Sequence, residues 1–387
     1  MRRIKLARKA AQRLEKGSVW VYRGELQNEI ASDQLESALL VDERGRLLGS
    51  ALIDGSSPVP VRLYSRREEA FGPELIDSRL KAALAWRRRV VVDGSTGYRL
   101  VFSEADGLPG LTIDRFGSAL AMQCNLRNYE EYARSIVSSI EALLQPEIEI
   151  DCVVAEQQGV RSLLVGDAGK SRPIYQLNSL KFEADLLEGP KTGAFLDQRE
   201  NYQVAAAWVE RLGLSGRALD LYASSGGFAM NLASRFSKVD AVDSSKSAVQ
   251  RIEANCRRNE IANVRAIEAD VKQFLRGLSQ ARQRYECVIV DPPAFAKQAR
   301  QKEEAERAYY DLNLRALSTV APSGLFVTCS CSHAIGESGL LSIVREAAAE
   351  SRRTLSILEK RKQSLDHREI LTIPETSYLK CFYFCVE

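Results

Sequence analysis

The order of apolar and polar positions divides the chain into three stretches of different character. From about residue 17 to 66, short apolar runs alternate with turn residues, a pattern typical of a small β-barrel. From about 73 to 172, a helical pattern at 74–89 precedes several strands and a second helix at 129–144. From about 178 onward, strand-like and helix-like segments alternate, which predicts a parallel sheet with crossover helices.

These patterns predict the individual strands and a division into domains. In the first two stretches we expect strands at 19–22, 38–41, 47–52, 59–63, 98–103, 111–114, 120–125, 152–156 and 162–165. In the third stretch we expect strands at 218–222, 239–242, 265–269, 287–290 and 324–332, with a helix at 247–258. We therefore predict three domains, at 1–72, 73–172 and 173–387, and an α/β fold class dominated by the third.

A glycine turn after the strand at 218–222 is the strongest local signal. Gly226 and Gly227 stand between this strand and a helical pattern, where they allow a ligand to approach the backbone closely. The turn lacks the G-x-G-x-x-G spacing that a dinucleotide pyrophosphate requires. NAD and FAD are therefore disfavoured as cofactors.

Four successive predicted strands carry an aspartate at or just beyond their carboxyl ends. These residues are Asp220, Asp243, Asp270 and Asp291. Any one of them could be a helix N-cap, but in open α/β sheets ligands bind outside the carboxyl ends of the strands. S-adenosylmethionine (SAM) would account for all four aspartates, which would serve its ammonium group, its ribose, its adenine and the reacting centre.

We therefore predict a SAM site along this edge of the sheet. The residues that we expect to bind the cofactor here are Asp220, Tyr222, Gly226, Gly227, Phe228, Asp243, Ser244, Asp270, Val271, Asp291 and Pro292. No metal site is expected, because the chain has two histidines and its eight cysteines include no CxxC pair.

The last of the four aspartates opens a rigid loop. Two prolines after Asp291 fix the backbone and remove two N–H donors, which leaves carbonyl groups free to accept hydrogen bonds. Amino-methylating enzymes carry an aromatic residue directly after such a pair of prolines, whereas Ala294 stands here. We expect Pro293, Phe295 and Lys297 to contact the substrate. Phe295, Tyr309 and Tyr310 are each candidates to stack on a target base or to pack in the core.

Two cysteines at the end of the strand at 324–332 are candidate nucleophiles. Methylation at carbon 5 of a pyrimidine needs a thiolate to add at carbon 6, because carbon 5 is otherwise a poor nucleophile. Cys329 and Cys331 are two residues apart, so on an extended strand they face the same way. Cys331 is nearer the carboxyl end, and we expect it to be the nucleophile. The alternative is that both are small buried residues.

Charge and cysteine usage restrict partners and location. The formal net charge of the 387-residue chain is only +3, but basic residues cluster in the N-terminal tract and at 87–89, 297–302 and 352–362. Such clusters suit phosphate contacts or solvated helix faces. No apolar run is long enough to span a bilayer and no secretory signal is evident, so we expect a cytoplasmic protein with reduced thiols.

Several long motifs resemble those of the bacterial ribosomal RNA large-subunit methyltransferase I family. They are ADGLPGLTIDR at 105–115, KTGAFLDQR at 191–199, DPPAFAK at 291–297, TCSCS at 328–332 and YLKC at 378–381. The resemblance implies an N-terminal PUA-like barrel, an α+β middle domain and a Rossmann-like methyltransferase domain with a mainly parallel seven-stranded sheet.

The same resemblance implies a function and further site residues. It implies formation of 5-methylcytosine in large-subunit rRNA, with Cys331 as nucleophile and Asp291 holding the base. It also implies that Phe195, Gln198 and Arg199 help to close the cofactor site.

Other functions remain open from the residues alone. An enzyme that methylates an exocyclic amino group would need the proline loop but no thiol. A catalytically idle RNA-binding or assembly protein could keep the sheet and the barrel. An NAD oxidoreductase is disfavoured by the absent glycine fingerprint, and a homodimer is left open.

Overall fold

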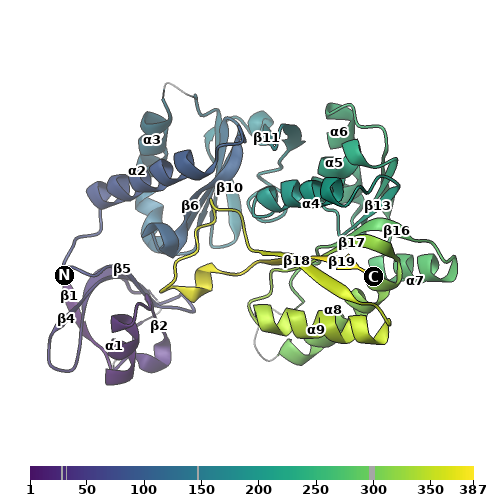
Figure 1. Ribbon diagram of the computed structural model, residues 1–387. Helices are drawn as coiled ribbons and strands as arrows, with labels where there is room; N and C mark the ends of the chain where they lie inside the picture. The colour runs from purple at the N-terminus through teal and green to yellow at the C-terminus, as the bar shows by residue number, and fades with distance from the viewer. Residues whose placement is uncertain (28, 32, 146–147, 296–300) are drawn as a thin grey trace. The chain divides into compact units, whose positions relative to one another are not determined.

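The computed structural model describes residues 1–387 except 28, 32, 146–147 and 296–300 (Figure 1). The chain forms two compact units, each of which is described by itself. The first unit contains Met1–Gln176, Ala184–Leu196 and Leu365–Thr376, and the second contains Leu177–Glu183, Asp197–Ser364 and Ser377–Glu387. Each unit is therefore assembled from segments that are distant in the sequence.

A five-stranded sheet forms the N-terminal part of the first unit. Its strand order is β1-β3-β4-β5-β2, with β1 and β3 parallel and the other neighbours antiparallel. The strands are β1 (Arg2–Lys5), β2 (Trp20–Val21), β3 (Leu35–Val41), β4 (Leu47–Asp54) and β5 (Val61–Ser65). Helix α1 (Arg8–Glu15) buries Ala10, Ala11 and Leu14. Our sequence reading missed β1 and α1 because their basic residues mask a narrow apolar stripe.

A second five-stranded sheet forms the middle part of this unit, in the order β10-β9-β8-β7-β6. Its strands are β6 (Gly97–Phe102), β7 (Leu111–Phe116), β8 (Ala119–Cys124), β9 (Cys152–Gln157) and β10 (Val160–Gly166). Helices α2 (Pro73–Val90) and α3 (Ala133–Leu144) share one hydrophobic core with this sheet. The predicted helix at 129–144 is wrong at its start, because a 3₁₀ segment occupies Arg127–Tyr132.

Buried hydrogen bonds join the segment Leu365–Thr376 to the middle part of the first unit. Arg87 lies 2.7 Å from Asp106 and donates to the carbonyl oxygen of Asp366, also at 2.7 Å. The Asp366 carboxylate accepts from the N–H of Arg99. The predicted domains are continuous stretches of the chain, whereas the two units are built from separate segments. The three-domain division therefore stays a prediction.

The second unit contains the seven-stranded, mainly parallel sheet that the sequence predicts. Its order is β15-β14-β13-β16-β17-β19-β18, and β19 is antiparallel to both neighbours. The strands are β13 (Arg217–Leu221), β14 (Lys238–Asp243), β15 (Val264–Glu268), β16 (Tyr285–Val290), β17 (Val320–Ser330), β18 (Leu355–Arg361) and β19 (Lys380–Val386). The short strands β11 (Ile174–Leu177) and β12 (Leu180–Glu183) precede it. The predicted fold class is confirmed.

Helices cover both faces of this sheet (Figure 1). They are α4 (Arg199–Arg211), α5 (Gly227–Leu232), α6 (Lys246–Arg258), α7 (Val271–Gln280), α8 (Lys302–Ser318) and α9 (Glu337–Glu350). The core shared with α7, α8 and α9 contains Leu219, Leu221 and Phe326, so the alternate positions of these strands face α4, α5 and α6. Asp220 and Cys329 lie at such alternate positions.

Candidate active site

The turn from β13 to α5 has an unusual backbone. Tyr222, Ser224 and Gly226 all have positive φ, at 63°, 52° and 85°. Gly226 is the N-cap of α5, where a left-handed residue without Cβ is best tolerated. The N–H of Ala223 bonds to the carbonyl of Val242, which ties the turn to β14. Non-glycine residues in this region are strained, and such strain concentrates at ligand sites.

Asp220 is a buried carboxylate at the start of this turn. Its Oδ2 accepts from the N–H of Ala229 at 3.0 Å, whereas Oδ1 is buried with no hydrogen-bond partner among the described residues. Burial, with smaller contributions from the negative charges of Asp291 and Asp243, raises the pKa of Asp220 to about 8. A buried carboxylate with an unused acceptor suits a cationic ligand group.

The next two aspartates lie at the ends of β14 and β15. Asp243 accepts from the N–H groups of Ser224 and Ser245, at 3.0 and 2.9 Å. Asp270 is exposed and is the N-cap of α7, where it accepts from the N–H of Gln273. The alternative role that the sequence allowed for each aspartate, that of a helix N-cap, therefore applies to Asp270. Because a carboxylate oxygen has two lone pairs, neither role prevents a ligand contact.

The remaining predicted cofactor residues differ in exposure. Phe228 and Val271 are buried, and the Phe228 ring packs edge-on against Tyr202. Tyr222 is half-buried and Ser244 is exposed. Burial, followed by the charges of Asp270 and Asp243, raises the pKa of Tyr222 to about 12, so these side chains lie near one another.

The three residues expected from the KTGAFLDQR motif are divided between the units. Phe195 belongs to the first unit, where Lys191 Nζ lies 4.4 Å from the centre of its ring. Gln198 and Arg199 belong to the second unit and are almost completely buried at the start of α4. The Gln198 side chain accepts from Asn201 at 2.6 Å. Their cofactor contacts stay predictions.

The two candidate thiols occupy different environments. Strand β17 ends at Ser330, so Cys331 follows the strand directly, and its expected common orientation with Cys329 stays a prediction. Cys329 is fully buried opposite Cys381 on β19, and burial holds its pKa well above the ordinary value. Cys331 is half-buried, and none of the eight cysteines is in a disulfide. Only Cys331 of this pair combines partial access with a position at the sheet edge.

The proline loop follows the neighbouring strand, β16. The N–H of Asp291 donates to the carbonyl oxygen of Leu221 on β13 at 3.3 Å, which holds the loop beside the cofactor turn. Asp291 is half-buried, Pro292 is buried and Pro293 is exposed. Lys297 lies outside the described residues.

The three aromatic residues near this loop that could stack on a base differ in their contacts. Tyr309 is fully buried, accepts a hydrogen bond from Ser330 Oγ at 2.9 Å, and its ring lies 4.8 Å from that of Phe295. The Tyr310 hydroxyl bonds instead to Glu350 on α9. Phe295 is half-buried and is therefore the better placed of the three to meet a base.

Lys380, at the start of β19, is a residue of this region to which our sequence reading gave no role. It lies opposite Ser330 in the β17–β19 ladder. Its ammonium donates to the carbonyl oxygens of Ser332 at 2.7 Å and Tyr378 at 2.8 Å. The available signal was a single lysine at the head of an otherwise apolar strand.

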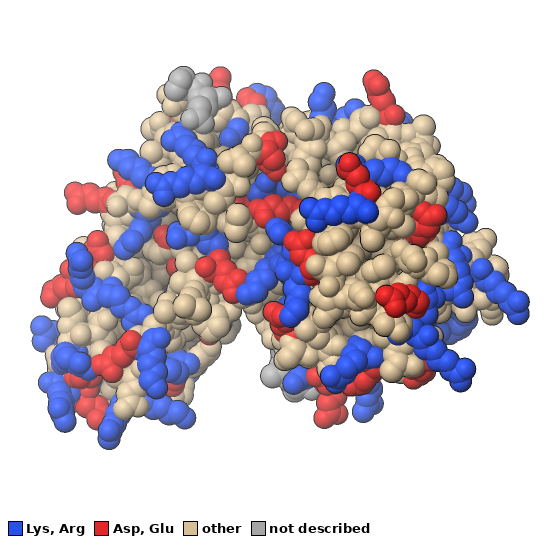
Figure 2. Space-filling view, viewed as in Figure 1, with Lys and Arg blue, Asp and Glu red and all other residues tan. Residues whose placement is uncertain are grey.

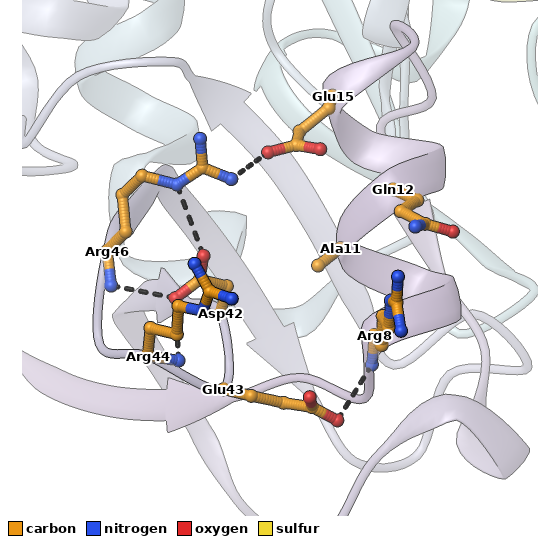
Figure 3. Close-up of a pocket in the computed structure, with 8 residues that line it drawn as sticks. All are labelled: Arg8, Ala11, Gln12, Glu15, Asp42, Glu43, Arg44 and Arg46. Atoms are coloured by element: carbon orange, nitrogen blue, oxygen red, sulfur yellow. Dashed lines mark hydrogen bonds and ion pairs between the residues drawn. The ribbon is translucent and has the colours of Figure 1, made fainter.

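A separate surface pocket lies between α1 and the turn from β3 to β4 (Figure 3), with a cavity volume of about 460 Å³. Arg46 forms ion pairs with both Asp42 and Glu15, and the arginines of the lining are matched in number by its acidic residues. The visible faces in Figure 2 likewise mix Lys and Arg with Asp and Glu. This pocket therefore offers little uncompensated charge.

Among the described residues, no group of three or more His, Cys, Asp or Glu side chains is placed to hold a metal ion. No helix in the described part of the chain has the length and apolar character needed to cross a membrane.

Comparison with family models defines the class of protein. Residues 161–372 match the S-adenosylmethionine-dependent methyltransferase model, and residues 4–66 match a PUA-like domain model. The chain is a SAM-dependent methyltransferase with an N-terminal PUA-like domain, as the sheet edge and its carboxylates indicate.

Curated relatives narrow this class. Ribosomal RNA large subunit methyltransferase I of Photobacterium profundum is 31% identical over 90% of this chain and 89% of its own. The protein of the same name from Escherichia coli is 30% identical over 98% of both chains. The chain belongs to the ribosomal RNA large subunit methyltransferase I family.

Solved structures agree with this fold. A methyltransferase complexed with SAH superimposes with a TM-score of 0.86 at 19% identity, over the full length of both chains. A Streptococcus mutans protein described as a SAM-dependent methyltransferase gives 0.84 at 18%, also over both full lengths. SAM is the cofactor of this chain, and the buried unpartnered oxygen of Asp220 fits its ammonium group.

Proposed function

We propose that this protein methylates carbon 5 of a cytosine in large-subunit rRNA, with Cys331 as the nucleophile and Asp291 holding the base. The proposal rests above all on the position of Cys331. It is a half-buried thiol at the carboxyl end of β17, beside the strand that leads into Asp291.

The arrangement of strands supports this assignment. Strands β13, β16 and β17 are adjacent and parallel, so Asp220, Asp291 and Cys331 lie at the same edge of the sheet. The charges of both Cys331 and Asp291 act on Tyr309, which lies between α8 and the sheet. A base held near Phe295 and Tyr309 would therefore meet both functional groups.

The chemistry follows from these residues. The Cys331 thiolate adds to carbon 6, and the electron pair of the carbon 5–carbon 6 double bond makes carbon 5 nucleophilic. SAM supplies the electrophilic methyl group. A base then takes the proton from carbon 5, the double bond forms again and the thiolate leaves.

The choice of substrate is supported by the relatives and by the N-terminal domain. The relatives are named for the large ribosomal subunit, and a PUA-like domain suits RNA binding. We expect the protein to act in the cytoplasm, where rRNA is made. Homodimer formation stays a prediction.

The decisive experiment is transfer of a tritiated methyl group to rRNA from a strain that lacks the gene, followed by identification of the product base. We expect 5-methylcytosine in the large-subunit rRNA. We also expect a covalent complex with RNA that contains 5-fluorocytosine or 5-azacytosine. Methyl transfer without such a complex would overturn the thiol mechanism.

The proline loop is also compatible with a different methylation reaction. Loops of this kind also occur in enzymes that methylate exocyclic amino groups, for which no thiol is needed. Full turnover by Cys331→Ala, with N4-methylcytosine or N6-methyladenine as product, would select that alternative.

A further inference from the structure

Lys380 is held beside the candidate nucleophile by the sheet itself. Ser330 and Lys380 are opposite each other in the antiparallel ladder, so the strand ends at 330 and 380 meet. From this position the lysine side chain donates to the carbonyl oxygen of Ser332, the residue after Cys331. Its second bond, to the carbonyl of Tyr378, fixes the same ammonium from the other side. The lysine thus holds the segment that carries Cys331.

Several titratable groups lie on the elements next to Cys331. They are Cys329 on β17, Cys381 and Tyr383 on β19, Tyr309 on α8, Asp291 after β16, and His333 and Tyr378 in the connecting segments. Burial raises the pKa values of Cys329, Tyr309 and Tyr383 above their ordinary values, so these three are neutral near pH 7. The charge of Asp291 disfavours a thiolate, and a cation is needed to offset it.

Lys380 supplies that cation and is electrostatically coupled to Cys331. Burial lowers the pKa of Lys380 to about 8, and the charge of Cys331 opposes this decrease. At pH 7 Lys380 is therefore mostly in its ammonium form, which favours a neighbouring thiolate.

We propose, on the basis of the proposed function, that Lys380 is a positioning residue whose ammonium orients the Cys331 segment and stabilises the thiolate form of Cys331. The thiol proton passes to solvent, and the electron pair stays on sulfur for attack on carbon 6. Elimination later returns the thiolate beside the same ammonium.

The test measures how the reactivity of Cys331 depends on pH in the full-length protein without RNA. The protein is alkylated with iodoacetamide, and mass spectrometry quantifies the peptide that contains Cys331, with Cys331→Ser assigning the signal. We expect a midpoint below the ~8.5 of an ordinary thiol. A wild-type midpoint at or above that value would overturn the proposal without any lysine variant.

Two substitutions at Lys380 separate charge from packing. Lys380→Met keeps the length of the side chain and removes the charge, so we expect alkylation at pH 7 to slow by about tenfold, one unit in midpoint. Lys380→Arg keeps a cation and should restore the low midpoint. Equal midpoints in wild type and Lys380→Met would overturn the proposal.

A matched control lies on the adjacent strand. Lys360 on β18 is exposed and forms an ion pair with Glu337, so Lys360→Met should leave the midpoint of Cys331 unchanged. Unchanged SAM affinity in Lys380→Met shows that the fold is intact. If the midpoints shift as expected but no 5-methylcytosine forms, the proposed function fails while the coupling of lysine and thiol stands.

Discussion

The two halves of the active edge of the seven-stranded sheet hold charges of opposite sign. The half formed by β13, β14 and β15 carries Asp220, Asp243 and Asp270, each of which accepts from backbone N–H groups. The half formed by β17 and β19 carries Lys380, which donates to backbone carbonyls beside Cys331. Both halves use backbone polar groups to fix a charge.

The difference follows from which backbone groups are free at each strand end. After β13 and β15 the chain enters a helix, whose first N–H groups have no partner within the helix and favour carboxylates. After β17 the chain continues as irregular backbone, and its carbonyl oxygens accept from an ammonium. The acidic half therefore suits a cationic cofactor, and the basic half suits a thiolate.

The largest expected effect is on the thiol half. Cys331→Ala should reduce methyl transfer by roughly 10³-fold or more, because carbon 5 loses its covalent activation. SAM affinity, measured by calorimetry, should not change, because the cofactor half is intact. Cys329→Ala is the control, and its turnover should stay within about threefold of wild type despite some loss of stability from the buried cavity.

On the cofactor half, Asp220→Asn should weaken SAM binding by about 10- to 100-fold, since a charged hydrogen bond is lost. Burial raises the pKa of Asp220 to about 8, so ionised Asp220 and its affinity for a cation increase as the pH rises toward 8. Below pH 8, SAM binding should therefore release more protons from the wild-type protein than from Asp220→Asn. Calorimetry in two buffers with different ionisation enthalpies measures this difference.

Ionisation of Asp220, which favours SAM binding, should disfavour folding. Because the pKa in the folded state exceeds the ordinary 3.8, the contribution of Asp220 to stability is present below pH ~4 and is lost as the pH rises toward 8. Asp220→Asn should lose less stability than wild type between pH 6 and 8 in denaturant unfolding. A parallel pH dependence in the two proteins would show that Asp220 is already ionised in the folded state.

A smaller effect is expected at the turn that begins the cofactor half. Gly226→Ala places a Cβ on a residue with φ of 85°, which costs about 1–2 kcal/mol and distorts the start of α5. Both the melting temperature and SAM affinity should fall. Gly277→Ala in α7, where a Cβ meets nothing within 4 Å, should instead raise stability by about 0.5–1 kcal/mol.

The smallest effect concerns the support of the thiol half. Tyr309→Phe removes the acceptor for Ser330 Oγ and should destabilise the protein by about 1 kcal/mol. Turnover should fall by only a few fold if the ring continues to support Phe295. A double-mutant cycle with Ser330→Ala isolates the hydrogen bond, and additive effects would show that the bond contributes nothing.

The fold was largely predictable because buried parallel strands are short, apolar and bounded by turns. The strands that became β13, β14, β15 and β16 were predicted to within two residues at each end. Strand β1 and helix α1 were missed because charged side chains interrupt their apolar positions. The membership of Leu365–Thr376 in the first unit could not be predicted, since it depends on buried hydrogen bonds between distant segments.

The candidate site was predictable to the same extent. Aspartates at successive strand ends are visible in the sequence, because parallel strands bring their carboxyl ends to one edge. The difference in burial between Cys329 and Cys331 was not visible, because it depends on contacts with distant segments. The same holds for Tyr309 and Tyr310, whose directions depend on the packing of α8.

The sequence by itself determined the class of fold and singled out the strand-end aspartates and the cysteine pair, because these follow from local periodicity and from the chemistry of single residues. Only the tertiary structure decided which thiol is accessible, that Asp220 has a buried oxygen with no hydrogen-bond partner among the described residues, and that Lys380 meets the segment of Cys331. Burial and proximity across strands arise from contacts between residues far apart in the chain, and no local pattern encodes them.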